Sequence, residues 1–126
     1  MRVLLAALLL IISLPGQAFS KTGHQLICDM AYQLASEDTR LQIDSLLKHT
    51  PYSAFGPACS WADDIRLQSE FAWSSPHHYV NMRRGDTAVS MAHCPEQGCI
   101  LSAINDMQQR LQQNNTDWQA LLFLAH

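Results

Sequence analysis

The stretch "HQLICDMAYQLASEDTRLQIDSLLKH", residues 24–49, indicates the fold class of this chain. A first helix is expected over residues 24–35, where apolar side chains recur at intervals of three and four on one face: Ile27, Met30, Ala31 and Leu34. Ser36 has the residue type of a helix N-cap, and a second helix over residues 37–49 would turn inward Ile43, Leu46 and Leu47. The stretch therefore predicts a helical hairpin.

Helical spacing returns toward the end of the sequence. Apolar residues at helical intervals predict a helix from residue 100 onward: Ile100, Ile104, Met107 and Leu111. Thr116 and Asp117 then open a last apolar helix, "WQALLFLAH". In between, "SWADDIRLQ" predicts a short amphipathic helix capped by Ser60, and residues 70–96 show no sustained period. The pattern predicts one all-α domain with a long irregular segment, the kind of segment in which binding sites are common.

The N-terminal stretch "MRVLLAALLLIISLPGQA" has the features of a secretory signal peptide. It carries one positive charge at Arg2, an apolar run too short to span a membrane, and small residues before a cleavage point after Ala18. Cleavage would leave residues 19–126 and make the net charge of −3 one unit more negative. A chain with that charge has no broad basic face to hold nucleic acid through phosphate contacts alone. Any anionic substrate must be bound locally, by a metal or a few arginines.

Four cysteines in an exported chain favour disulfides. Cys94 and Cys99 bracket the turn-forming residues "PEQG" and can close a small loop, with Cα atoms expected roughly 4.4–6.8 Å apart. That pairing leaves Cys28 to pair with Cys59. A zinc ribbon is the alternative, but the cysteines lack its paired CxxC spacing.

Two short stretches offer ligands for a metal. In "FSKTGH", residues 19–24, a free N-terminus at Phe19 would contribute its amine and carbonyl oxygen, and His24 an imidazole; otherwise His24 is a polar residue that begins the first helix. In "CSWADDIR", residues 59–66, adjacent helical residues point about 100° apart, so only one of Asp63 and Asp64 can face a site. Arg66 can contact a phosphate there, or simply form an ion pair with Asp63.

Histidines supply the remaining candidates. "PHHYVN", residues 76–81, places His77 and His78 before Tyr79 and Asn81. His126 follows an apolar run, so a buried imidazole at this position needs a hydrogen-bond partner or a metal.

Taken in order, five motifs resemble the zinc-dependent, single-strand-specific type I nucleases, the S-one/P-one family: "FSKTGH", "CSWADDIR", "PHHYVN", "CPEQGC" with "ILSAI", and "ALLFLAH". The resemblance extends over residues 19–126. It implies an all-α fold, similar to that of bacterial zinc phospholipases C, with three zinc ions in a cleft. It also implies a monomer that hydrolyses single-stranded DNA or RNA to 5′-phosphate products, is secreted or periplasmic, and has no membrane partner.

The resemblance assigns roles to individual residues. Asp63, His78 and His126 correspond to three ligands of one buried zinc, so their donor atoms should lie within about 3–4.5 Å of one another. Phe19 and His24 correspond to the pair that holds an exposed zinc, although the family usually has tryptophan at the first position. Arg66 corresponds to the residue that faces the phosphate. Tyr79 and Asn81 correspond to an aromatic that stacks on a base and a polar residue that binds its edge, and the two cysteine pairings agree with some relatives.

In the family, further aspartate and histidine ligands follow the position of His126, and this chain contains none of them. We therefore expect the chain to be the N-terminal part of a nuclease domain and to be inactive by itself. Two alternatives stay open: a non-catalytic remnant that binds zinc, or a zinc phospholipase C. The second is disfavoured because "HYVN" resembles a base pocket more than a lipid headgroup site.

Overall fold

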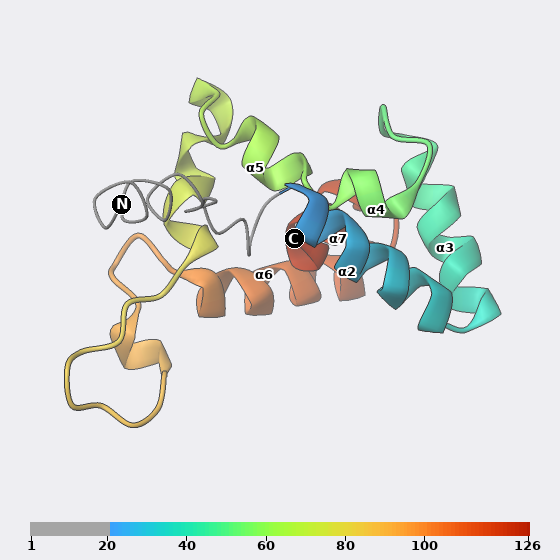
Figure 1. Ribbon diagram of the computed structural model, residues 1–126. Helices are drawn as coiled ribbons and strands as arrows, with labels where there is room; N and C mark the ends of the chain where they lie inside the picture. Colours follow the sequence, from blue (N-terminus) through green and yellow to red (C-terminus); the bar gives the residue numbers. More distant parts are fainter. Residues whose placement is uncertain (1–20) are drawn as a thin grey trace, which may run out of the picture.

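Helices form the whole regular structure of residues 21–126, the part of the chain that the computed structural model describes, and no strand occurs among them (Figure 1). The α-helices are α2 (Lys21–Leu34), α3 (Glu37–Leu47), α4 (Phe55–Ala58), α5 (Trp61–Ile65), α6 (Ile100–Gln113) and α7 (Trp118–Ala125). Two 3₁₀ helices accompany them, η1 (Ser69–His78) and η2 (Met91–His93). The predicted all-α fold class is confirmed. The predicted signal peptide and Phe19 lie outside the described residues.

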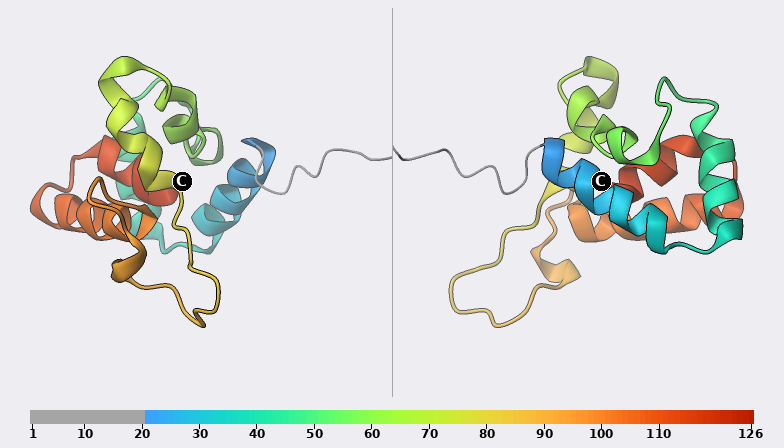
Figure 2. Two further views of the ribbon diagram at one scale, coloured as in Figure 1. Left: turned by 90° about the vertical axis from the view of Figure 1, so that its left-hand side faces the viewer. Right: turned by 45° about the vertical axis from the view of Figure 1, so that its right-hand side comes forward.

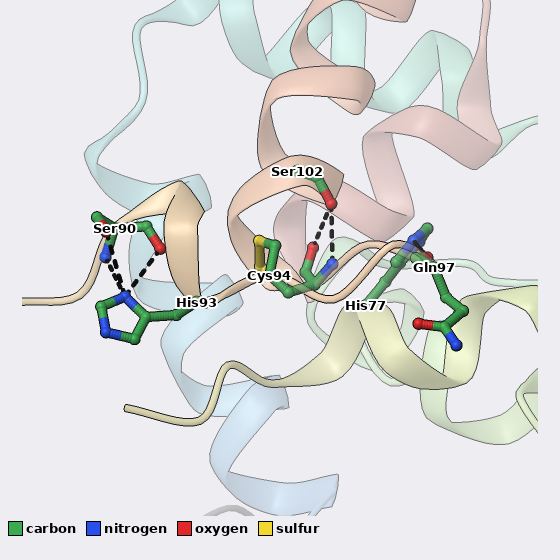
Figure 3. The surroundings of a disulfide bond; sticks show 7 residues. His77, Ser90, His93, Cys94, Gln97 and Ser102 are labelled. Carbon is green, nitrogen blue, oxygen red and sulfur yellow. Dashed lines mark hydrogen bonds between the residues drawn. A yellow bond between two sulfur atoms is a disulfide. The ribbon is translucent and has the colours of Figure 1, made fainter. Parts of the chain in front are cut away.

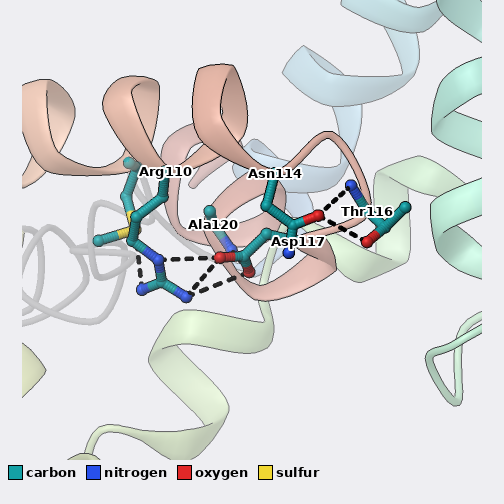
Figure 4. Close-up of polar contacts among 6 residues, drawn as sticks. Arg110, Asn114, Thr116, Asp117 and Ala120 are labelled. Atoms are coloured by element: carbon teal, nitrogen blue, oxygen red, sulfur yellow. Dashed lines mark hydrogen bonds and ion pairs between the residues drawn. The ribbon is translucent and has the colours of Figure 1, made fainter.

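Polar residues begin two of the helices as the sequence predicts. The Ser36 hydroxyl accepts a hydrogen bond from the Thr39 amide at 3.2 Å, which satisfies a free N–H at the start of α3. The Asp117 carboxylate accepts one from the Ala120 amide at 3.0 Å at the start of α7, and Arg110 of α6 pairs with the same carboxylate at 2.8 Å (Figure 4). These contacts fix the turn between α6 and α7.

The prediction of Ser60 as a capping residue is wrong. Its backbone is already helical, with φ −90° and ψ −3°, and its side chain makes no cap hydrogen bond. The Ser60 hydroxyl instead donates to the carbonyl oxygen of Lys21 at 3.5 Å. Ser60 therefore links the start of α5 to the start of α2.

Three helices, α4, η1 and η2, lie where the sequence indicates none. The single turn of α4 buries Phe55 and Ala58, and Gly56 leaves no room for a Cβ atom beside the Asp29 carboxylate of α2. The segment predicted to be irregular from residue 70 contains η1, a 3₁₀ helix that includes Pro76. Such short pieces have no apolar period of their own, because packing against other elements stabilises them.

An aromatic cluster around Trp61 forms the centre of the core. The Trp61 ring makes edge contacts with Phe71, Trp118 and Phe123 at centroid distances of 5.5, 5.1 and 5.0 Å. Leu122 is fully buried beside them. The cluster ties α5 to η1 and α7, so the elements that carry the candidate site residues share one core.

The apolar face that the sequence indicates on the first helix is exposed. Ile27, Met30 and Leu34 are 64%, 62% and 84% exposed, and Ala31 is exposed too. The buried residue of α2 is Cys28, because this side of the helix packs on α4. Periodicity identifies an apolar face, but the neighbouring elements decide whether it is covered.

The second helix follows the prediction. Its buried residues are the expected ones, Ile43, Leu46 and Leu47.

The remaining helices pack around the end of α7. α6 lies along α7 and contacts η1, and α5 contacts α7, so the C-terminal residue lies close to the centre of the molecule (Figure 1). The segment between η1 and α6 projects away from the helices in both further views (Figure 2). No helix among residues 21–126 is long and apolar enough to cross a membrane.

Both expected disulfides are present. Cys28 pairs with Cys59 across α2 and α4, with Cα atoms 6.5 Å apart, and Cys94 pairs with Cys99 at 5.0 Å. The second disulfide closes the turn that leads into α6, where the Ser102 hydroxyl accepts a hydrogen bond from the Cys99 amide at 2.9 Å (Figure 3). The zinc ribbon alternative is excluded, since no cysteine among the described residues is free.

Candidate metal centre

The Asp63 carboxylate is the centre of the candidate site. Its Oδ1 lies 3.8 Å from His78 Nε2 and 3.7 Å from His126 Nε2. A tetrahedral zinc ion with bonds of about 2.0–2.1 Å holds its ligand atoms about 3.3–3.5 Å apart. The two distances are only a few tenths of an ångström longer than that spacing, so Asp63 Oδ1 lies close to ligand spacing from each of the two imidazoles.

Backbone carbonyl oxygens fix the orientation of both imidazoles. His78 Nδ1 lies 2.9 Å from the Ser74 carbonyl oxygen, and His126 Nδ1 lies 2.8 Å from that of Cys59. A carbonyl oxygen only accepts, so each Nδ1 carries the proton and donates it. Each Nε2 is left with a lone pair aimed toward Asp63, which is the arrangement that metal-ligating histidines use.

His78 Nε2 provides the test of whether the residues fit a metal. It is buried and has no hydrogen-bond partner among the described residues. A buried polar nitrogen without a partner is costly, and such an atom calls for an explanation such as an ion. Two imidazole nitrogens and a carboxylate oxygen are also the donor types that zinc prefers, so the residues fit zinc.

His24 joins the same group. One donor atom each of His24, Asp63 and His126 lies within 4.8 Å of the others, and the His24 ring stacks on that of His126 at 4.3 Å. Together with His78, four donors come from α2, α5, η1 and the end of α7. The expectation that His24 and Phe19 hold a separate ion stays a prediction, since Phe19 lies outside the described residues.

Burial lowers the pKa of His126. Desolvation is the largest cause and opposes the charged form; His24 and His78 act in the same direction, while the Cys59 carbonyl and Asp63 raise the pKa. The net effect favours the neutral imidazole, the form that binds a metal.

Asp63 and Asp64 face different partners. Asp63 points to the histidines, whereas the Asp64 carboxylate lies 2.9 Å from Lys21 Nζ and raises the pKa of that lysine. Arg66 Nη1 lies 3.1 Å from Asp63 Oδ1, so the intrahelical ion pair exists. The Arg66 side chain is 46% exposed and stays available at the edge of the site.

Two pockets flank the imidazoles of His78 and His126. One of about 270 Å³ lies between η1, α6 and α7, with Trp73, Ile104 and Phe123 in its wall. The other, of about 240 Å³, is lined by residues of α2 that include His24. His78 and His126 line both pockets, so these two imidazoles can be reached from either side.

The residues expected to bind a base follow the site directly. Tyr79 comes next after His78, its side chain is 55% exposed, and its carbonyl oxygen accepts a hydrogen bond from the Ile100 amide at 3.1 Å. Asn81 is exposed at the start of the projecting segment. Both side chains are accessible to a ligand.

Sequence reasoning missed the groups that support the site. The Ser74 carbonyl lies one helical turn before His78, and a correct prediction of η1 would have indicated it. His77 Nε2 lies 3.2 Å from the Gln97 carbonyl oxygen, and this contact joins η1 to the turn closed by the Cys94–Cys99 disulfide (Figure 3). The Cys59 carbonyl lies far from His126 in the sequence and no local pattern indicates it.

The comparisons with known proteins show the family of the chain. The family model of the S1/P1 Nuclease family matches residues 19–126, and the chain belongs to that family. Endonuclease 5 of Arabidopsis thaliana is 30% identical over 129 residues, which cover 86% of this chain and 42% of the relative. Nuclease P1 of Penicillium citrinum is 27% identical over 112 residues, 82% of this chain and 42% of the relative. The chain thus spans about two-fifths of the length of these relatives.

Proposed function

We propose that residues 19–126 are the N-terminal part of an exported, zinc-dependent endonuclease that hydrolyses single-stranded DNA or RNA to 5′-phosphate products. One observation carries the proposal: the unpartnered Nε2 of His78 lies 3.8 Å from the Asp63 carboxylate, which His126 Nε2 approaches to 3.7 Å. Membership of the S1/P1 Nuclease family supports the reaction class.

Asp63, His78 and His126 would hold one zinc ion, and His24 would hold a second with the main chain of Phe19. When bound, clustered zinc activates water and neutralises charge on the phosphate. The carbonyls of Ser74 and Cys59 keep the imidazoles in the tautomer that such binding requires.

The other residues at the site would bind the nucleic acid. The Arg66 guanidinium, half exposed beside Asp63, is suited to a phosphate oxygen. The exposed ring of Tyr79 offers a face for base stacking, and Asn81 an amide for the edge of the base. Because these contacts are few, the site would accept single strands whose bases are free to turn outward.

We also propose that the chain by itself is inactive. It would supply side-chain ligands for one ion and an N-terminal chelate for another, and residues 21–126 offer no further group of candidate ligands for a third. The two disulfides support an oxidising location, secreted or periplasmic. A monomer is expected. The alternative function is a non-catalytic remnant that binds zinc, which the donor atoms of His24, Asp63 and His126, within 4.8 Å of one another, would also serve.

Activity measurements test the proposal. We expect purified residues 19–126 not to hydrolyse single-stranded DNA or RNA in excess zinc, and a version extended by the remaining part of a relative such as Endonuclease 5 to do so. In the extended protein, Asp63→Ala or His78→Ala should abolish turnover. Arg66→Gln should lower turnover with zinc still bound, and Tyr79→Ala should mainly weaken substrate binding.

Two outcomes would contradict different parts of the proposal. Zinc-dependent hydrolysis by residues 19–126 alone would overturn their proposed inactivity. An extended protein that folds and binds zinc but cuts no single strand would overturn the nuclease function and favour the zinc-binding remnant.

A further inference from the structure

The Cys28–Cys59 disulfide lies among the segments that carry the candidate ligands. Cys28 follows His24 by four residues in α2, so the two side chains share one face of that helix. Cys59 precedes Asp63 by four residues, at the end of α4. Both cysteines are nearly inaccessible, at 4% and 0% exposure. The bond therefore joins the His24 segment directly to the Asp63 segment.

The same disulfide also contacts the third segment. The Cys59 carbonyl oxygen accepts the hydrogen bond from His126 Nδ1 at 2.8 Å. Cys28 Sγ lies 3.6 Å from the carbonyl oxygen of Ala125, the residue before His126. One covalent link thus joins the helical segments that carry His24 and Asp63, each four residues from its cysteine, and contacts the last two residues, Ala125 and His126.

We propose that Cys28 and Cys59 are positioning residues for the metal centre: their disulfide holds three of the four candidate side-chain ligands, His24, Asp63 and His126, in place before zinc binds. This inference rests on the proposed zinc function. Ligands that are already in position lose less conformational freedom on binding, so the affinity for the ion is higher. His78 depends on the bond least, because the Ser74 carbonyl within η1 orients it.

The second disulfide provides a matched control. Cys94–Cys99 closes a turn between η2 and α6, and the Cys99 amide bonds to Ser102, which is no candidate ligand. Its removal takes away the same kind of covalent bond without loosening His24, Asp63 or His126.

The experiment compares zinc binding by residues 19–126 with that of the two double variants, without thiol reductants, because these bind zinc. We expect Cys28→Ser/Cys59→Ser to raise the zinc Kd about 10- to 100-fold, the range typical of residues that orient metal ligands. Cys94→Ser/Cys99→Ser should change the Kd less than about threefold. Equal changes in the two variants, or an unchanged Kd in the first, would overturn the proposal. Circular dichroism checks that each variant keeps its helical structure. If the Cys28→Ser/Cys59→Ser protein does not fold, the Cys28→Val/Cys59→Ala variant, which keeps this buried position apolar, takes its place in the comparison.

A second measurement separates positioning from general destabilisation. Nitrogen NMR of the metal-free protein reports which imidazole nitrogen carries the proton. We expect the Nδ1–H form of His126 to be lost in the Cys28/Cys59 variant and that of His78 to be kept. Retention of both signals would contradict the inference. A wild-type chain that shows these signals but binds no zinc would overturn both the proposed metal function and this inference, whereas zinc binding unaffected by the variant would overturn the inference alone.

Discussion

Replacement of Asp63 by asparagine, compared with the same change at Asp64, tests the metal centre most directly. The two carboxylates are adjacent in α5, yet only Asp63 lies near imidazole nitrogens, at 3.7 and 3.8 Å, while Asp64 pairs with Lys21 at 2.9 Å. Asparagine keeps the side-chain shape and removes the negative charge. We therefore expect Asp63→Asn to weaken zinc binding strongly and Asp64→Asn to leave it nearly unchanged.

The magnitude follows from the proposed role of Asp63 as a direct ligand. Loss of a residue that only orients a ligand typically costs 10- to 100-fold in metal affinity, so loss of a ligand charge should cost at least about 100-fold. That factor corresponds to about 2.8 kcal/mol of binding free energy. The simultaneous loss of the exposed Arg66–Asp63 ion pair is worth only a few tenths of a kcal/mol and does not obscure the result.

Competition with a chromogenic zinc chelator at about pH 7.5 measures the effect in residues 19–126. Thermal unfolding of the metal-free variants serves as the control for folding. If Asp63→Asn and Asp64→Asn bind zinc with the same affinity, Asp63 is not a ligand and the site is wrongly assigned.

Two further predictions concern stability. The lowered pKa of His126 favours its neutral form in the folded chain. The resulting contribution to folding stability is therefore complete above the pKa of about 6.5 in the unfolded chain and is lost as the pH falls through the lowered pKa of the folded chain. The urea unfolding free energy of the metal-free protein should therefore decline from pH 7 to 5, and His126→Gln should make the decline shallower; an unchanged slope would argue against this cause. Leu122→Ala, at a fully buried position, should cost about 2–5 kcal/mol of unfolding free energy. Leu34→Ala, at a position 84% exposed, should change the unfolding free energy by no more than about 0.5 kcal/mol. Similar losses of unfolding free energy for the two variants would contradict the placement of Leu122 in the core.

The sequence by itself determined the features that depend on neighbours along the chain. The buried residues of α3 and the capping residues Ser36 and Asp117 follow from interactions between residues three or four apart. The two disulfides were predictable because one pair brackets a short turn, which leaves only one partner for each remaining cysteine.

Tertiary structure alone decided which polar and apolar groups meet. The apolar face of α2 is exposed because α4 packs on its other side, and the period of the sequence is the same in either case. Asp63 faces the histidines while Asp64 pairs with Lys21, since adjacent helical residues point in different directions and the packing of α5 decides which one faces the site. The His126 imidazole is oriented by the Cys59 carbonyl, 67 residues away in the sequence. A backbone carbonyl is the same group at every residue, so only the folded chain can show which one a histidine meets.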